Sequence, residues 1–185
     1  MHQTAIHSIA IDEYLRGELE SEVRHEYIDG QVYAMAGAGE KHNLIAGNLF
    51  SELRQKSRGT ECRPFISDMK LYLAAANKFY YPDIMLACDP EDNHEYYKER
   101  PCLLIEVLSA SAETTDRREK LHAYQGLPSL KEYVLISQDK PQIEMYQRTN
   151  NNWNYFLLDN MEDVLHLSCL NLDITLPLIF EDVFN

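Results

Sequence analysis

The sequence lacks any apolar run long enough to cross a bilayer, and no basic segment followed by a long apolar stretch stands near its start. We therefore expect a cytoplasmic protein that does not interact with a membrane. The GxSxG, HExxH, P-loop and dinucleotide-binding glycine patterns are also missing. None of the enzyme classes that these short motifs identify is indicated.

Cysteine is scarce, and its spacing does not suggest a metal site. The four cysteines are far apart in the sequence and form no CxxC pair: Cys62, Cys88, Cys102 and Cys169. Zinc sites typically use closely spaced Cys or His ligands, so zinc is disfavoured. We expect reduced cysteines in the core and no disulfide framework.

Positive charge is in short supply. Lysine and arginine number 17 against 30 acidic residues, which gives a formal net charge of −13. Nucleic-acid-binding proteins usually display a basic face, and this balance disfavours tight, sequence-specific binding. Basic clusters at residues 54–58 and 117–120 could supply a small patch, although a solvated helix face is the ordinary interpretation. Any nucleic-acid partner is expected to bind weakly or transiently.

The length and composition predict one domain. The chain has 185 residues, of which 45% are hydrophobic, so it can bury a substantial core. We find no internal repeat, low-complexity segment or linker. Residues 1–185 are therefore expected to form a single domain.

Periodicity and turn signals predict a mixed arrangement of helices and strands. Apolar residues recur at helical spacing in two segments, 9–19 and 40–58. A third helix is expected at 113–124, after small polar residues that can cap it and before Gly126 and Pro128, which end it. A hairpin is expected at Asp29-Gly30, and a polar loop at residues 89–100. Further strands are expected at 61–65, 68–73, 130–138, 142–148 and 152–158, and a short apolar helix or strand within 170–184. The predicted fold is α/β of the α+β type: a central mixed sheet flanked by helices, with an added antiparallel meander.

Two apolar runs, residues 82–88 and 102–109, each carry one carboxylate. These are Asp83 and Glu106. Such runs are typical of buried strands, where an ionised carboxylate costs several kcal/mol unless a cation or several donors offset it. One interpretation is a shared cation. The other is a pair of strand-end acids satisfied by backbone amides or arginine.

Other acids and a lysine are candidates for the same site. Asp116, Lys120 and Tyr124 are spaced four apart on a predicted helix and share one face, which a surface ladder would also explain. Glu26 precedes the hairpin turn and could be a solvent-facing strand residue. His42, in the first turn of the helix at 40–58, is interpreted as a cap-region or partly exposed residue.

The order of acid, long loop, acid and lysine-bearing helix suits a metal-dependent phosphodiester hydrolase. Two or three carboxylates and the main-chain carbonyl of Val107 would hold Mg²⁺ or Mn²⁺, which prefer oxygen ligands. The cation would polarise the phosphate and lower the pKa of a bound water, and a nearby ammonium would offset the developing negative charge.

These residues carry a resemblance that extends over nearly the whole chain. The matching positions are Tyr81-Pro82-Asp83, Glu106-Val107-Leu108-Ser109, Asp116, Lys120, Tyr124, Gly126 and the upstream segment at residues 25–30. Together they resemble the Uma-type family of restriction endonuclease-like proteins, a branch of the PD-(D/E)xK nuclease superfamily.

The resemblance implies a restriction-endonuclease-like core. Asp83 and Glu106 would be metal ligands, and Glu26 an additional acid. The superfamily's lysine usually lies two residues after the second acid, where this chain has Leu108, so the resemblance makes Lys120 the catalytic candidate. Asp116 and Tyr124 would support these groups. The alternative function is a catalytically inactive protein of the same fold that acts as a dimeric binding or regulatory module. A homodimer is possible under either function.

Overall fold

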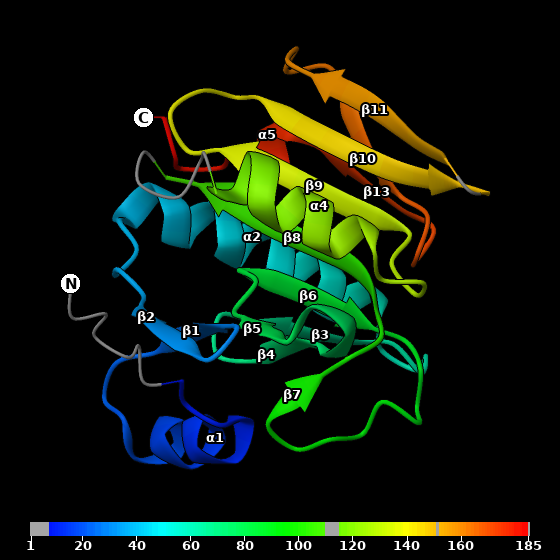
Figure 1. The fold of residues 1–185 in the computed structure, drawn as a ribbon. Coiled ribbons are helices and arrows are strands. Elements are labelled where there is room, and N and C mark those ends of the chain that lie inside the picture. Colours follow the sequence, from blue (N-terminus) through cyan, green and yellow to red (C-terminus); the bar gives the residue numbers. More distant parts are fainter. Residues whose placement is uncertain (1–7, 110–114, 151, 185) are drawn as a thin grey trace.

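A computed structural model describes residues 8–109, 115–150 and 152–184. Two β-sheets and a separate hairpin form the framework, and helices pack against both sheets (Figure 1). The helical elements are α1 (Ile11–Glu20), α2 (Glu40–Lys56), η1 (Ala74–Ala76), η2 (Asp116–Lys120), α4 (Leu121–Gln125) and α5 (Leu176–Ile179). No helix in these residues is long and apolar enough to span a membrane.

The large sheet has the order β11-β10-β9-β8-β6-β3. Its strands are β3 (Arg63–Ile66), β6 (Ile84–Ala87), β8 (Pro101–Leu108), β9 (Glu132–Ser137), β10 (Ile143–Thr149) and β11 (Asn152–Leu158). β8 and β9 run parallel and the other neighbours antiparallel, so the sheet is mixed. The antiparallel order β9-β10-β11 is the meander that the sequence predicts. Every residue of β8 is buried, as its apolar run requires.

The small sheet has the order β2-β1-β5-β4-β7. Its strands are β1 (His25–Ile28), β2 (Gln31–Ala34), β4 (Lys70–Leu73), β5 (Lys78–Tyr80) and β7 (Tyr97–Lys98). The β1–β2 turn is the predicted one: Asp29 and Gly30 have φ values of 50° and 86°, as this type of two-residue turn needs. A further hairpin joins β12 (Val164–Leu167) to β13 (Leu172–Thr175).

The predicted fold class is confirmed, with one refinement. Mixed sheets flanked by helices are present, but the strands divide between two sheets where one central sheet was expected. The predicted helix at 113–124 corresponds to η2 and α4; its predicted first residues lie outside the described part of the chain.

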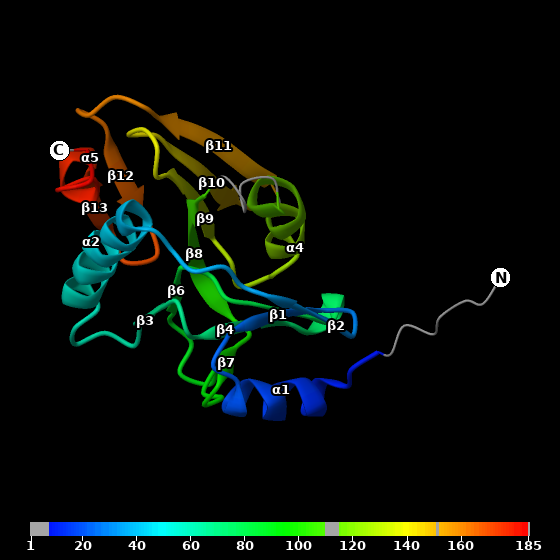
Figure 2. The same cartoon turned by 90° about the vertical axis from the view of Figure 1, so that its left-hand side faces the viewer.

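The large sheet lies between two helical layers, with α2 and α5 on one face and α4 on the other (Figure 2). Side chains of β8 alternate between these faces. Ile105 and Val107 join the core formed with α2, whereas Leu104 and Leu108 join the core that includes Tyr124 of α4. Glu106 therefore projects toward α4 and the small sheet.

The expectation of four reduced cysteines is wrong. Cys62 and Cys88 form a disulfide, while Cys102 and Cys169 carry free thiols. The physical reason is strand register: Arg63 pairs with Ala87 across β3 and β6, so the residues just beyond that pair face each other. The separation of 26 residues in sequence gives no sign of this contact.

Candidate active site

Asp83 and Glu106 lie on one face of the large sheet, opposite each other. Ile84 pairs with Ile105 in the antiparallel β6–β8 ladder, so the residue before Ile84 is opposite the residue after Ile105. Asp83 stands one position before β6, and Glu106 lies within β8. Two like charges at directly opposed positions destabilise a sheet unless something offsets them.

Asp83 is held by a main-chain donor and a histidine. The amide of Val107 donates to Oδ2 of Asp83 at 2.7 Å, and Nε2 of His42 lies 3.1 Å from the same oxygen. Burial alone would lower the pKa of His42, but hydrogen bonding to Asp83 and the charge of that carboxylate raise it above its usual value. The cationic imidazole, which can donate to Asp83, is therefore favoured.

Glu106 is a deeply buried carboxylate, with only 3% of the residue exposed. Its Oε1 accepts a hydrogen bond from the hydroxyl of Tyr124 at 3.0 Å and lies 3.3 Å from Nζ of Lys120. Burial raises the pKa of Glu106 well above its ordinary value, and repulsion from nearby carboxylates adds to the shift. Neither donor fully compensates for the loss of hydration.

Lys120 is the centre of the acidic cluster. Besides contacting Glu106, its Nζ lies 3.0 Å from Oδ1 of Asp116 and 3.3 Å from Oε1 of Glu26. It projects from η2, a single π-helical turn of a kind that often occurs at functional sites. Burial would lower the pKa of Lys120, but the surrounding carboxylates raise it well above the usual value. The ammonium form is thus fixed inside the protein.

The cluster carries more negative than positive charge. Burial raises the pKa of Glu26 and of Asp116, so their ionised forms are also incompletely stabilised. Oδ1 of Asp116 is fully buried and has no hydrogen-bond partner with suitable geometry, although the ammonium of Lys120 is near. Four carboxylates face only one lysine and one histidine, so the cluster has an excess of negative charge. A bound cation would offset this excess.

The donor set fits a small, hard cation. The acids offer only oxygen, the atom that Mg²⁺ and Mn²⁺ prefer, and Mg²⁺ commonly uses one or two carboxylates with water in the other positions. Among residues 8–109, 115–150 and 152–184, no group of three or more His, Cys, Asp or Glu side chains is arranged to hold a metal by itself. A cation at this cluster would therefore need water in several of its coordination positions.

The structure brings the predicted site residues together from four elements. Glu26 comes from β1, Asp83 precedes β6, Glu106 lies in β8 and Lys120 in η2. The proposed main-chain ligand, the carbonyl of Val107, stays a prediction, since the contact that the structure places here uses the amide of that residue.

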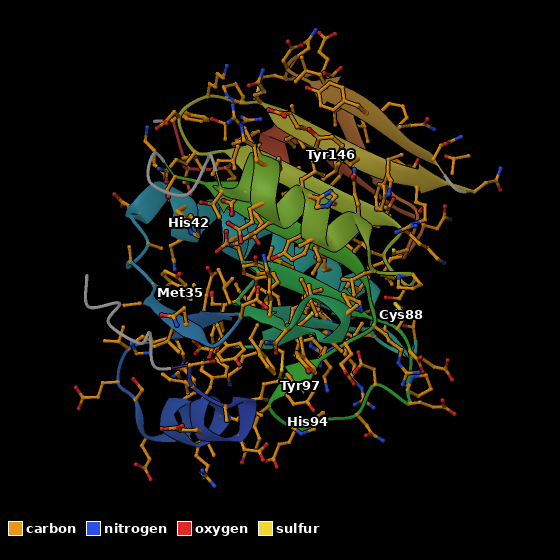
Figure 3. All side chains as sticks on the ribbon, viewed as in Figure 1. Met35, His42, Cys88, His94, Tyr97 and Tyr146 are labelled. Atoms are coloured by element: carbon orange, nitrogen blue, oxygen red, sulfur yellow. A yellow bond between two sulfur atoms is a disulfide. The ribbon has the colours of Figure 1, made fainter. Side chains whose placement is uncertain are left out.

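Sequence reasoning missed His42, which contacts Asp83 across 41 positions. Figure 3 shows this histidine on α2, on the side of the molecule away from Cys88. The only local signal is a histidine in the first turn of a helix, and that signal is equally typical of a cap-region residue.

Comparisons with known proteins show the family and the fold of this chain. The sequence profile of the Uma2 family, described as "Putative restriction endonuclease", matches residues 11–178. Two relatives come from Synechocystis sp. (strain ATCC 27184 / PCC 6803 / Kazusa). The uncharacterized protein slr1290 is 32% identical over 171 residues, which covers 91% of this chain and 90% of the relative. The uncharacterized protein sll1609 is 36% identical over 139 residues, which covers 74% of this chain and 78% of the relative.

A solved structure has the same fold. The crystal structure of a "putative nuclease belonging to DUF820" from Anabaena variabilis ATCC 29413 superimposes with a TM-score of 0.75 and 18% sequence identity. The match covers 95% of this chain and 99% of the other.

Proposed function

Because the chain belongs to the Uma2 family of restriction endonuclease-like proteins, we propose that it is a metal-dependent nuclease that hydrolyses phosphodiester bonds. The observation that carries this proposal is the meeting of two opposed carboxylates, Asp83 and Glu106, with the buried ammonium of Lys120. A purely structural role would leave the excess negative charge of the cluster unexplained.

Asp83 and Glu106 would bind Mg²⁺ or Mn²⁺ together with the carbonyl of Val107, and Glu26 is the additional acid. Val107 and His42 contact Oδ2 of Asp83, and the two donors to Glu106 contact Oε1. The other oxygen of each carboxylate, which makes none of these contacts, would be available to a cation. When bound, such an ion polarises a phosphate and acidifies a coordinated water.

The protein's own groups position the reactants. Lys120 would orient the attacking water and stabilise negative charge as it develops on the phosphate. Glu26 and Asp116 hold that ammonium in place, at 3.3 and 3.0 Å. Tyr124 fixes Glu106 through its hydroxyl, so the carboxylate keeps one orientation.

The nucleic acid would be bound weakly. A net charge of −13 repels a polyanion at long range, and phosphate contacts normally supply most of the affinity. A divalent ion reduces the negative charge in the site itself. We therefore propose a transient encounter with a nucleic-acid strand.

Cleavage assays on plasmid, single-stranded DNA and RNA, with and without Mn²⁺, test the proposal. We expect metal-stimulated cleavage that falls at least about 100-fold in Asp83→Asn, Glu106→Gln and Lys120→Met, the usual scale for losing one group that stabilises a transition state. The matched control is Glu95→Gln, which removes one acid from an exposed loop and should cleave like wild type.

Two results would decide against this function. Equal activity in wild type and all three variants would indicate a contaminating nuclease. Metal binding without cleavage of any substrate would favour the alternative, a non-catalytic module that has kept the fold.

A further inference from the structure

The four cysteines, dispersed in the sequence, meet in one cluster. Cys62 and Cys88 are joined, and Sγ of Cys102 lies 3.5 Å from Sγ of Cys88. The disulfide carries no proton, so the thiol of Cys102 is the donor in this contact. Sγ of Cys169 in turn donates to the carbonyl oxygen of Cys102 at 3.1 Å. We call these residues the cysteine cluster.

The cysteine cluster is separate from the acidic site. Cys88 directly follows β6, whereas Asp83 directly precedes it, so the two are about 16 Å apart along the strand. Figure 3 shows Cys88 at the edge of the molecule away from His42, which contacts Asp83. The proposed nuclease chemistry uses no cysteine.

We propose that the cysteine cluster is an intramolecular thiol–disulfide exchange site. The thiolate of Cys102 attacks Sγ of Cys88, the nearest disulfide sulfur. A Cys88–Cys102 bond forms, the Cys62–Cys88 bond breaks, and Cys62 leaves as a thiolate that takes up the proton Cys102 has lost. One disulfide and two thiols are present before and after, so the step needs no oxidant or reductant.

The surroundings of Cys62 favour its release. Cys62 lines an open pocket of about 400 Å³ together with Arg54, Arg58 and Arg63. Guanidinium groups near a cysteine stabilise its thiolate, which makes it a better leaving group and then a reactive thiol. After the exchange, the reactive thiol is that of Cys62 and no longer that of the buried Cys102. Cys62 lies in a basic pocket that suits a small anionic thiol or disulfide.

Cys169 has a different role. Hydrogen bonding with Cys102, together with burial, raises the pKa of Cys169 and keeps it a protonated, weakly nucleophilic thiol. Its Sγ donates to the main-chain carbonyl of Cys102, a bond that does not involve a disulfide sulfur. Removing its sulfur should leave the exchange intact, so Cys169→Ser is the matched control.

Alkylation of the native protein, purified without reductant, tests this proposal. The protein is held at pH 8 with excess iodoacetamide, quenched in acid, and mapped by mass spectrometry without reduction. We expect alkylated Cys62 and a Cys88–Cys102 disulfide to accumulate in wild type and in Cys169→Ser. In Cys102→Ser, Cys62 should stay bonded to Cys88 and be labelled at least about 10-fold more slowly.

A second measurement examines the pocket. Iodoacetate is the anionic counterpart of iodoacetamide, and the arginines of the pocket should attract it. The ratio of the iodoacetate rate to the iodoacetamide rate at Cys62 should therefore fall several-fold in the double variant Arg54→Gln/Arg58→Gln. An unchanged ratio would overturn the assignment of the pocket.

Several outcomes would overturn the exchange site itself. The first is labelling of Cys62 that is as fast in Cys102→Ser as in wild type. The second is formation of disulfides to Cys169 as readily as the Cys88–Cys102 bond, because such a mixture indicates exchange in an unfolded chain. A third is Cys102→Ser protein with no Cys62–Cys88 bond after exposure to air. One zinc ion per chain that protects all four thiols until it is chelated would also overturn the proposal, in favour of a metal site.

Discussion

Glu106 illustrates how burying a single carboxylate can lower the stability of a fold. It is 3% exposed in the middle of a buried strand, and its neighbours include Asp83, Asp116 and Glu26. Burial raises its pKa above the value in an unfolded chain, so between those two values the folded protein holds a proton that the unfolded chain releases. The contribution of this group to the free energy of unfolding is therefore largest at low pH and is lost as the pH rises above about 4.3.

The variant Glu106→Gln measures, in the absence of metal, how far the buried carboxylate lowers the free energy of unfolding. With EDTA present, we expect its free energy of unfolding at pH 8 to exceed that of wild type by about 1–3 kcal/mol, the scale for removing a poorly compensated buried polar group. The difference should shrink toward pH 4.5, where the wild-type carboxyl is protonated. Glu26 and Asp116 still pair with Lys120 in the variant.

Urea denaturation followed by circular dichroism at both pH values provides the measurement. Glu95→Gln, the exposed control, should match wild type throughout. A Glu106→Gln protein less stable than wild type at pH 8 would mean that the existing donors already compensate the ionised carboxylate.

At the scale of single residues, the sequence predicts the acids of the cluster better than it predicts the residues that contact them. Glu106 could be identified from the sequence because a charged residue within an apolar run is unusual, whatever the strand packs against. The contacts of His42 with Asp83 and of Cys62 with Cys88 depend on elements distant in sequence, and spacing along the chain does not encode them.

Among the elements, the β12–β13 hairpin depends on one buried carboxylate of β9. Glu132 is 0% exposed, and its oxygens accept from the amides of Ser168 and Cys169 at 2.7 and 3.1 Å. Gln147 of β10 donates to it as well, at 3.2 Å. These bonds tie the turn between β12 and β13 to the large sheet.

Replacing Glu132 should loosen that hairpin. In Glu132→Gln one acceptor oxygen becomes an NH2 group that faces an amide donor and cannot accept from it, so we expect the free energy of unfolding to fall by about 2–3 kcal/mol. Native-state hydrogen exchange should be faster at Ser168 and Cys169 than at amides of β8. Glu162→Gln, an exposed position in the preceding turn, is the control, and comparable stability of the two variants would contradict this account.

Local signals account for which elements were predictable. Asp29-Gly30 predicts its turn because few residues adopt positive φ, and α2 has its apolar residues at helical spacing. The division of the strands between two sheets has no such signal. β4 pairs with β7, a two-residue strand inside the segment 89–100 that the sequence predicts to be a loop, and only the folded chain creates this contact.

For the whole molecule, the acidic site lies where the two sheets meet a helix. The small sheet contributes Glu26, the large sheet Glu106, and η2 contributes Lys120 between them. The site thus depends on how the two sheets and η2 pack together, and the overall charge of −13 adds to the excess negative charge within it. A divalent cation that reduces this repulsion should stabilise the complete fold by mass action.

Calorimetric titration with Mn²⁺ tests the central claim most directly, because it needs no substrate. We expect one ion to bind per wild-type chain and in the Glu95→Gln control, and binding to weaken at least about 10-fold in Asp83→Asn, in line with the loss of one carboxylate ligand. Equal binding by wild type and Asp83→Asn, or no binding by wild type, would contradict the account that these opposed acids hold a cation.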